Sequence, residues 1–322
     1  MLLGEKPGDN AQSLRLARAL GLPFETKTLV LQPGFERTKP TVEPSLEPFD
    51  PERSDPLKPP WPDMVLTIGR RLAMAGLWIK AQSGSTKLAL IGVPKGRERE
   101  FDLVIAPIHY RIAQAPNVLR IGLPLLVPDA DMLSSAAEKW RPVFAGMARP
   151  LTAVFVGGST GAHRFTLAEA RKLLGYLDFP GSAYIVTSRR TPPAEVRILE
   201  TGKPESAIVY RWRPDDPENP YFGLLALADQ FVVTGDSISM LVEVARLGKP
   251  LAIAPFHSTL WQRCLSRGRS RDINVLHEYL YKGGWAVRSG EPFIVPTGSP
   301  PDDTLTAVPR LAALLELEQI HV

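Results

Sequence analysis

Residues 230–255 read QFVVTGDSISMLVEVARLGKPLAIAP and contain an apolar run, a short polar turn, a helical stretch and a second apolar run. Neither apolar run alternates with polar residues, so each is expected to be a strand covered on both faces. A strand, a crossover helix and a second strand form a parallel unit. Ligands of open parallel sheets bind beside the turns that follow the carboxyl ends of strands. The turn Thr234-Gly235-Asp236-Ser237 is therefore a candidate site.

The same alternation extends along the rest of the chain. Apolar runs at 64–69, 87–92, 102–107 and 118–122, and again at 152–158, 183–188 and 207–212, are separated by helical patterns. A break at residues 141–150 divides the two sets. This pattern predicts an α/β protein of two tandem Rossmann-like domains with parallel sheets and a cleft between them.

The predicted boundaries follow from these breaks. The amino-terminal domain is expected over residues 1–145 and the carboxyl-terminal domain over 146–300. A last helix in the segment 301–322 is expected to pack across both domains. The proline-rich residues 32–60 lack a periodic apolar pattern and are predicted to form an irregular surface excursion.

Composition limits the cellular setting and the partners. The formal charge of +4 is a mild bias toward anionic partners, and the single cysteine, Cys264, excludes an internal disulfide. No secretory leader and no long uncharged apolar run is seen, so the protein is expected to be cytoplasmic. Peripheral contact with the inner face of a membrane, for example through Lys95 to Arg99, stays open. No basic and aromatic platform indicates nucleic-acid binding.

A glycine-rich loop follows the strand predicted at 152–158. It contains Gly157, Gly158, Ser159 and Thr160. Glycines let the backbone approach a ligand, hydroxyls donate hydrogen bonds, and a following helix presents free N–H groups to a phosphate. The loop is predicted to cradle a phosphate, although it is not a P-loop, because no Gly-Lys-Ser/Thr ends it. A flexible turn with incidental glycines is the alternative.

The same loop also matches the G-x-S-x-G pattern of α/β-hydrolases. Ser159 would be the nucleophile, and Asp236, His257 and His277 follow in the order that a hydrolase triad requires. The helical pattern, however, starts only near Thr166, whereas a nucleophile elbow needs a helix that begins at the serine. A hydrolase is therefore the third hypothesis for function.

Two further features lie at strand ends or just after them. Ser188, Arg189 and Arg190 follow the strand at 183–188, and two guanidinium groups can hold a diphosphate through bidentate hydrogen bonds. A solvated basic turn is the alternative. After the quoted turn, where Ser237 or Asp236 is expected to cap the helix, Glu243 can accept hydrogen bonds from two ribose hydroxyls. An exposed helix charge is the other interpretation of Glu243.

These motifs carry a family resemblance. Residues 219–255, from NPYFGLL to LAIAP, resemble the carboxyl-terminal nucleotide-sugar signature of GT-B glycosyltransferases. The stretches GEKPGDNAQ, VGGSTGAHRFT and VTSRRTP, in order with NPYFGLLALADQFVVTGDSISM, look like the bacterial family related to the plant mitochondrial-fission factor. The resemblance implies a GT-B fold, a nucleoside-diphosphate sugar as donor substrate, and a ribose-binding role for Glu243.

The resemblance also implies a function and a catalytic base. The protein would transfer a sugar to an acceptor held by the amino-terminal domain, a lipid-linked acceptor of cell-envelope glycan synthesis being one option, with no metal and no further cofactor. Comparable family members often carry His where this chain has Asp9. His109, which follows the strand predicted at 102–107, is the alternative base by its place at the carboxyl end of a strand, or else a hydrogen-bonded structural histidine. A non-catalytic nucleotide-binding scaffold at a membrane surface is the second hypothesis.

Overall fold

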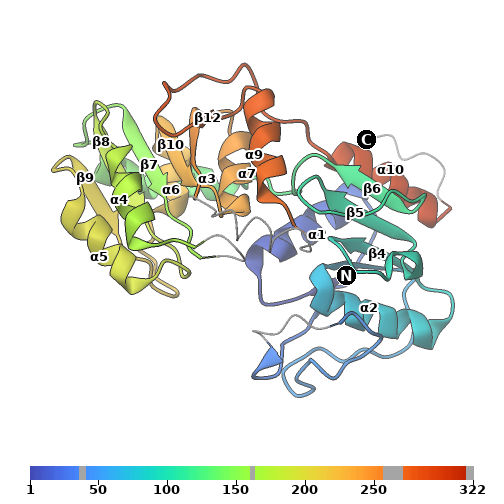
Figure 1. Cartoon of the computed structure of the whole chain (residues 1–322). Helices are drawn as coiled ribbons and strands as arrows, with labels where there is room; N and C mark the ends of the chain where they lie inside the picture. Colours follow the sequence, from blue (N-terminus) through green and yellow to red (C-terminus); the bar gives the residue numbers. More distant parts are fainter. Residues whose placement is uncertain (36–40, 160–163, 257–270, 317–322) are drawn as a thin grey trace. The chain divides into compact units, whose positions relative to one another are not determined.

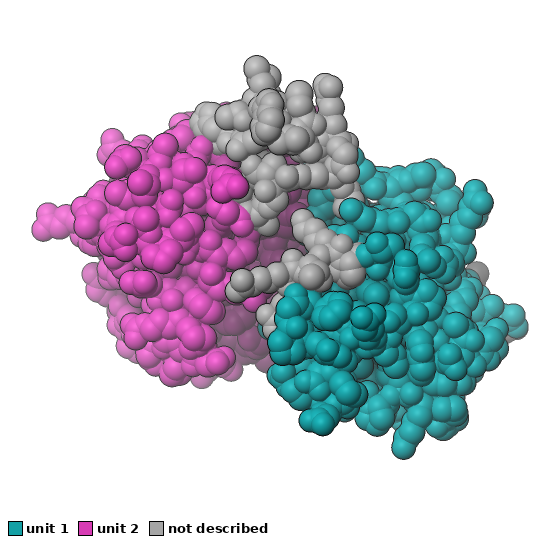
Figure 2. Space-filling model, turned by 60° about the horizontal axis from the view of Figure 1, so that its bottom comes forward, with its two compact units in different colours: residues 1–126, 270–272, 301–322 teal, residues 127–269, 273–300 magenta. Residues whose placement is uncertain are grey.

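The computed structural model describes residues 1–35, 41–159, 164–256 and 271–316 (Figure 1). The chain divides into two compact units, coloured in Figure 2. Unit 1 comprises residues 1–126, 270–272 and 301–322, and unit 2 comprises residues 127–269 and 273–300. The division follows residue 126, whereas the sequence pattern placed it at 145, because helix α3 (Ala130–Phe144) packs against helix α6 (Tyr221–Leu227) of unit 2.

Unit 1 is built on parallel strands with helices around them. Four strands form a sheet in the order β3-β4-β5-β6, and β1 pairs with β2 in a separate two-stranded sheet. The strands are β1 (Leu2–Leu3), β2 (Lys27–Thr28), β3 (Met64–Ile68), β4 (Lys87–Ile91), β5 (Leu103–Pro107) and β6 (Val118–Ile121). The helices are α1 (Pro7–Ala19), α2 (Gly69–Ser83), the short 3-10 helix η2 (Glu98–Glu100) and α10 (Thr304–Leu314).

The last helix belongs to the core of unit 1. Leu311 and Val308 of α10 are fully buried in the same cluster as Leu16 of α1. Because α10 packs against α1 and β5, the terminal helix completes one unit, whereas the sequence suggested a strap across two domains.

The proline-rich stretch 32–60 is irregular, as predicted, over the residues that the structure describes there. It is not confined to the surface, because Val42 and Phe49 are almost fully buried in the unit 1 core. Two apolar anchors therefore hold a segment whose sequence is mostly polar.

Unit 2 contains a six-stranded parallel sheet in the order β12-β11-β10-β7-β8-β9. Its strands are β7 (Leu151–Phe155), β8 (Ser182–Val186), β9 (Ala207–Tyr210), β10 (Gln230–Thr234), β11 (Leu251–Ala254) and β12 (Val287–Arg288). The helices besides α3 and α6 are α4 (Leu167–Gly175), α5 (Pro193–Gly202), α7 (Ile238–Arg246) and α9 (Ile273–Lys282). The chain runs outward from β7 to β9 and then returns to β10, so the strand order reverses between β7 and β10.

Successive residues of β7 show that both faces of this sheet are covered. Val154 lies in the apolar cluster that contains Leu173 of α4. Phe155 faces the other way and contacts the rings of Tyr221 and Phe231, at 4.6 and 5.6 Å between centroids. Two buried faces explain why the strands carry apolar residues at consecutive positions.

Candidate functional site

Three predicted loops meet at the reversal point of the unit 2 sheet. Because β7 lies between β8 and β10, the residues that follow these three strands share one edge. They are the glycine loop after β7, the Ser188–Arg190 turn after β8 and the Thr-Gly-Asp-Ser turn after β10. Thr160 of the glycine loop lies outside the described residues.

Asp236 joins the three loops. Its side chain is 0% exposed and forms an ion pair with Arg190 at 2.9 Å. It also accepts hydrogen bonds from the Gly158 amide at 2.9 Å and from the Thr234 hydroxyl at 2.7 Å. Burial raises the pKa of Asp236, while Arg190 and the two hydrogen bonds act in the opposite direction. The sequence predicts Asp236 to be a ligand-binding residue, and in the structure three donors of the protein itself satisfy its carboxylate.

The glycines are required by this close approach. A Cβ atom at Gly157 would lie 2.4 Å from a carboxylate oxygen of Asp236, and one at Gly158 would lie 2.0 Å from the backbone oxygen of Arg190. The Gly157 amide donates to the Thr234 hydroxyl at 2.8 Å, and the Gly158 amide is bound to Asp236. Both N–H groups already donate hydrogen bonds that hold the loop in place. Support of the loop is therefore an alternative role to the predicted binding of phosphate.

The turn after β8 is attached to the glycine loop through its hydroxyls. Ser188 donates to the Gly157 carbonyl at 2.8 Å, and the Thr191 hydroxyl donates to the same oxygen. Of the two arginines, Arg190 is held by Asp236, whereas Arg189 is exposed. Arg189 is thus the residue of this turn that is available to an anion.

Helix α7 begins without a side-chain cap. Ser237 occupies the N-cap position, but its side chain forms no capping hydrogen bond with any described residue. Asp236 is directed to Gly158, Thr234 and Arg190 instead. Ser237 is therefore the N-cap residue, as one of the two predicted alternatives, but neither side chain caps the helix. Among the described residues, no side chain caps the first N–H groups of α7, and a helix N-terminus favours an anion.

Glu243 lies in α7 beside the first residue of α6. The Tyr221 hydroxyl donates a hydrogen bond to its carboxylate. Burial raises the pKa of Glu243, and the hydrogen bond from Tyr221 opposes this change. Glu243 is thus a half-buried carboxylate with a fixed partner, which is not the solvated helix charge of the alternative interpretation.

The raised pKa of Glu243 predicts a stability change with pH. An acid whose pKa is raised in the folded state stabilises the fold below its unfolded pKa, ordinarily 4.5, and that contribution is lost as pH rises through the folded value. Glu243→Gln should remove the cost of the buried charge and still accept from Tyr221. We expect the variant to be at least as stable as the wild type at pH 7 by thermal unfolding. The melting temperature of the wild type, measured relative to that of the variant, should be lower at pH 7 than at pH 4. A variant that is clearly less stable than the wild type at pH 7 would contradict this expectation.

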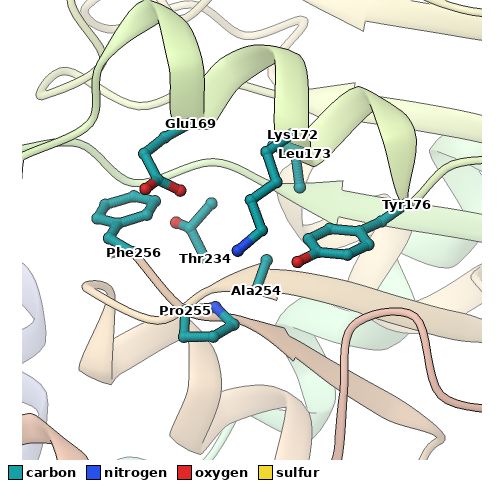
Figure 3. Close-up of a pocket in the computed structure, with 8 residues that line it drawn as sticks. All are labelled: Glu169, Lys172, Leu173, Tyr176, Thr234, Ala254, Pro255 and Phe256. Atoms are coloured by element: carbon teal, nitrogen blue, oxygen red, sulfur yellow. The ribbon is translucent and has the colours of Figure 1, made fainter. Parts of the chain in front are cut away.

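A small pocket opens beside the same strand ends (Figure 3). Residues of α4 and of the ends of β10 and β11 line it: Glu169, Lys172, Leu173, Tyr176, Thr234, Ala254, Pro255 and Phe256. Its empty volume is about 180 Å³, open solvent included. Ligand pockets usually enclose about 300–1,000 Å³, so this pocket by itself can hold only part of a nucleotide.

The geometry does not support the hydrolase hypothesis. Ser159 accepts a hydrogen bond from the Phe165 amide at 3.1 Å, and α4 begins only at Leu167. His277 contacts the Gly235 carbonyl at 2.7 Å through Nε2, and Asp236 is bound to Arg190. His257 lies outside the described residues. Over the residues that the structure describes, no helix begins at Ser159, as the strand-to-helix elbow of a hydrolase nucleophile would require.

The two predicted bases belong to unit 1. Asp9 lies in the first turn of α1, is 39% exposed and pairs with Lys6 at 3.7 Å. His109 follows β5 and is only 3% exposed. Burial, and then the charge of Arg271, lower the pKa of His109 to about 3. His109 is consequently neutral at pH 7 and a weak proton acceptor in this state.

Sequence reasoning missed the partners of the predicted residues. Tyr221 and Thr191 carry no motif of their own, and their roles follow from Glu243 and from the Gly157 carbonyl. The only available signal for Tyr221 was its place in the NPYFGLL stretch, which the family resemblance already contained.

The chain belongs to the family described as Mitochondrial fission ELM1, whose pattern matches residues 7–313. The Mitochondrial fission protein ELM1 of Arabidopsis thaliana is 28% identical over 245 residues, which is 68% of this chain and 57% of that protein. The chain thus spans little more than half the length of this relative. The uncharacterized protein RP120 of Rickettsia prowazekii is 28% identical over 269 residues, covering 69% of this chain and 75% of that protein.

Solved structures of the same architecture confirm the predicted GT-B-like fold. The S. aureus MnaA structure with UDP covers 98% of this chain and 96% of its own, with a TM-score of 0.52 and 12% identity. The UDP-GlcNAc 2-epimerase of Neisseria meningitidis, bound to UDP-GlcNAc, covers 98% of both chains, with a TM-score of 0.51 and 11% identity. In the described part of the chain, no helix combines the length and apolar character needed to span a bilayer.

Proposed function

We propose that unit 2 binds a nucleoside-diphosphate sugar and that the protein transfers the sugar to an acceptor held by unit 1. The observation that carries the proposal is the meeting of three polar loops at the reversal point of a parallel sheet, where ligands of such sheets bind. The two similar structures are complexes with UDP and with UDP-GlcNAc, which supports a nucleotide sugar as the ligand.

Different described residues of unit 2 would bind different parts of such a donor. The uncapped N-terminus of α7 and the exposed Arg189 supply hydrogen bonds and positive charge for a diphosphate. Glu243, held by Tyr221, accepts from the ribose hydroxyls. Asp236 and Arg190 would not contact the donor themselves but would hold the glycine loop in place. The same donors stabilise the diphosphate as it leaves, which is the largest electrostatic requirement of sugar transfer.

A panel of UDP-, GDP-, ADP- and CMP-sugars tests the donor site by thermal unfolding. A ligand at a hundredfold excess over its dissociation constant stabilises the folded state by about 2.7 kcal/mol, so one nucleotide should raise the melting temperature by several degrees. Glu243→Gln should lose this shift, because an amide offers a ribose one acceptor oxygen in place of two. Glu200→Gln, an exposed residue of α5, should keep it. The absence of a shift with every nucleotide would refute the proposal.

A non-catalytic scaffold at a membrane surface is the second candidate, and the name of the family supports it. The two hypotheses, transferase and scaffold, are separated by following the label of a nucleotide sugar that is known to bind from its shift of the melting temperature. Transfer of label to an acceptor in a cell extract supports the transferase. Binding without any turnover of the labelled donor supports the scaffold.

A further inference from the structure

Two arginines of unit 1, Arg70 and Arg271, form a cluster with Tyr110 at the carboxyl ends of the strands. Arg70 follows β3 in the first turn of α2, and Tyr110 follows β5. Arg271 forms a β-bridge with Tyr110, donates to its hydroxyl, and places its guanidinium carbon 4.7 Å from the centre of the ring. Arg271 comes from a distant part of the chain but belongs to unit 1.

The backbone is shaped around this cluster. Gly92, which follows β4, adopts a φ of 121°, a conformation that L side chains rarely adopt. A Cβ atom there would lie 3.7 Å from the Gly69 nitrogen and 3.9 Å from the Tyr110 hydroxyl. The ends of three neighbouring strands and the N-terminus of α2 are therefore gathered around the Tyr110 hydroxyl.

Arg70 lies where its own environment disfavours a positive charge. The N-terminus of a helix is the positive end of its dipole and favours acidic side chains, yet the first turn of α2 has none, and no described side chain caps it. Arg70 is partly buried, and burial followed by the charge of Arg271 lowers the pKa of Arg70. Within the described residues, no carboxylate pairs with Arg70 or Arg271, whereas the neighbouring Arg111 is paired with Asp272 at 2.6 Å.

A buried imidazole lies next to the same cluster. The rings of His109 and Tyr110 are 4.4 Å apart between centroids. The Nδ1 atom of His109 is buried and has no hydrogen-bond partner among the described residues. A buried polar atom without a partner is costly, which is a second indication that a ligand belongs here.

We infer that Arg70, Arg271 and the N-terminus of α2 form a binding site for a phosphate group in unit 1. Two guanidinium groups and free backbone N–H groups are the combination that proteins use for phosphate. The assignment of this phosphate to the sugar acceptor rests on the proposed function, but the binding of phosphate does not. The acceptor class would then be a phosphate or diphosphate ester. Its negative charge would also offset the effect of Arg271 on His109 and make the imidazole a stronger base.

Calorimetry with inorganic phosphate and with pyrophosphate on the full chain tests the site. Arg70→Gln and Arg271→Gln should each weaken binding about 10-fold to 100-fold, the usual effect of losing a charged hydrogen bond. Arg53→Gln, an exposed arginine of the same unit, removes the same charge and should bind like the wild type. Equal weakening in all three variants, or in none, would overturn the inference.

Hydrogen exchange on the wild type locates the anion independently of any variant. Phosphate should protect the amides at the start of α2, around residues 69–72. Protection confined to unit 2 would overturn the inference even if a variant failed to fold.

Arg70→Gln should still respond to the nucleotide sugar that stabilises unit 2. Phosphate binding without any nucleotide response would support this site and refute the proposed function. A nucleotide response without phosphate binding in unit 1 would support the proposed function and refute this site.

Vesicles distinguish the two sources of a phosphate ester. If soluble glycerol 3-phosphate binds as tightly as inorganic phosphate, the ligand is a soluble phosphate ester. If binding requires phosphatidic acid in phosphatidylcholine vesicles, the ligand is a lipid headgroup. In both cases Arg271→Gln should weaken the binding about 10-fold to 100-fold, and binding as tight as that of the wild type in this variant would place the phosphate elsewhere.

Discussion

Gly158→Ala is expected to lower the stability of unit 2 by about 3 kcal/mol, which corresponds to about 10 °C in melting temperature for a unit of this size. The added Cβ would lie 2.0 Å from the Arg190 oxygen and 2.3 Å from its carbonyl carbon. Both are backbone atoms, so no rotamer change can relieve the contact. The loop must move, and its hydrogen bond to Asp236 would be strained or lost.

Gly175→Ala is the matched control for this substitution. Gly175 is the last residue of α4 in the same unit, and a Cβ atom there would meet nothing within 4 Å. The change should be neutral or stabilising by up to about 1 kcal/mol, the difference in helix propensity between the two residues. Thermal unfolding of both variants is the measurement. A Gly158→Ala variant that melts within about 2 °C of the wild type would contradict the described loop packing.

Asp236→Ala is expected to cost about 3–4 kcal/mol, because it breaks a largely buried ion pair and leaves several donors without an acceptor. The Gly158 amide, the Thr234 hydroxyl and the Arg190 guanidinium all donate to this carboxylate. The value is set below the upper range for buried pairs because Arg190 is 33% exposed and can recover some hydration. Chemical denaturation of the purified variant measures the loss.

A double-mutant cycle with Arg190→Ala separates the ion pair from the other contacts. The coupling energy should be about 1–3 kcal/mol, because the second substitution removes the guanidinium that the first left unpaired. Asp178→Ala, an exposed residue of the same unit, should change stability by less than about 0.5 kcal/mol. Additive effects of Asp236 and Arg190 would mean that the two side chains do not interact in solution.

These variants also test what the glycine loop is for. If Gly158→Ala and Asp236→Ala lose stability but the folded fraction still binds a nucleotide sugar, the loop is a structural support. If both also lose binding far beyond their loss of folded protein, the loop contacts the ligand as the sequence predicts. Glu243→Gln is the complementary variant, since it is expected to keep its stability and lose the ligand.

Sequence patterns were sufficient for most of the parallel strands and crossover helices and for the loops that carry polar residues, but they did not predict β2, β12 or α9. Each of these signals is local: runs such as residues 251–254 are apolar throughout because both sheet faces are covered, and the turn after β10 is readable from its small polar residues. Asp236 and Glu243 could be singled out from this information. Which residues they pair with could not be predicted, although Gly158, Thr234 and Arg190 had themselves been singled out as candidates.

Tertiary structure alone decided how those residues are used. Asp236 turns back toward Gly158 and Arg190, Glu243 accepts from Tyr221, and Arg271 donates to Tyr110. Each pair comes from different segments of the chain, and the spacing of residues in a sequence carries no record of which loops a strand order will bring together. The order of strands, with β7 between β8 and β10, places those loops at one edge. Once there, burial forces each carboxylate to find a donor, and that requirement determines which side chains remain available for a ligand.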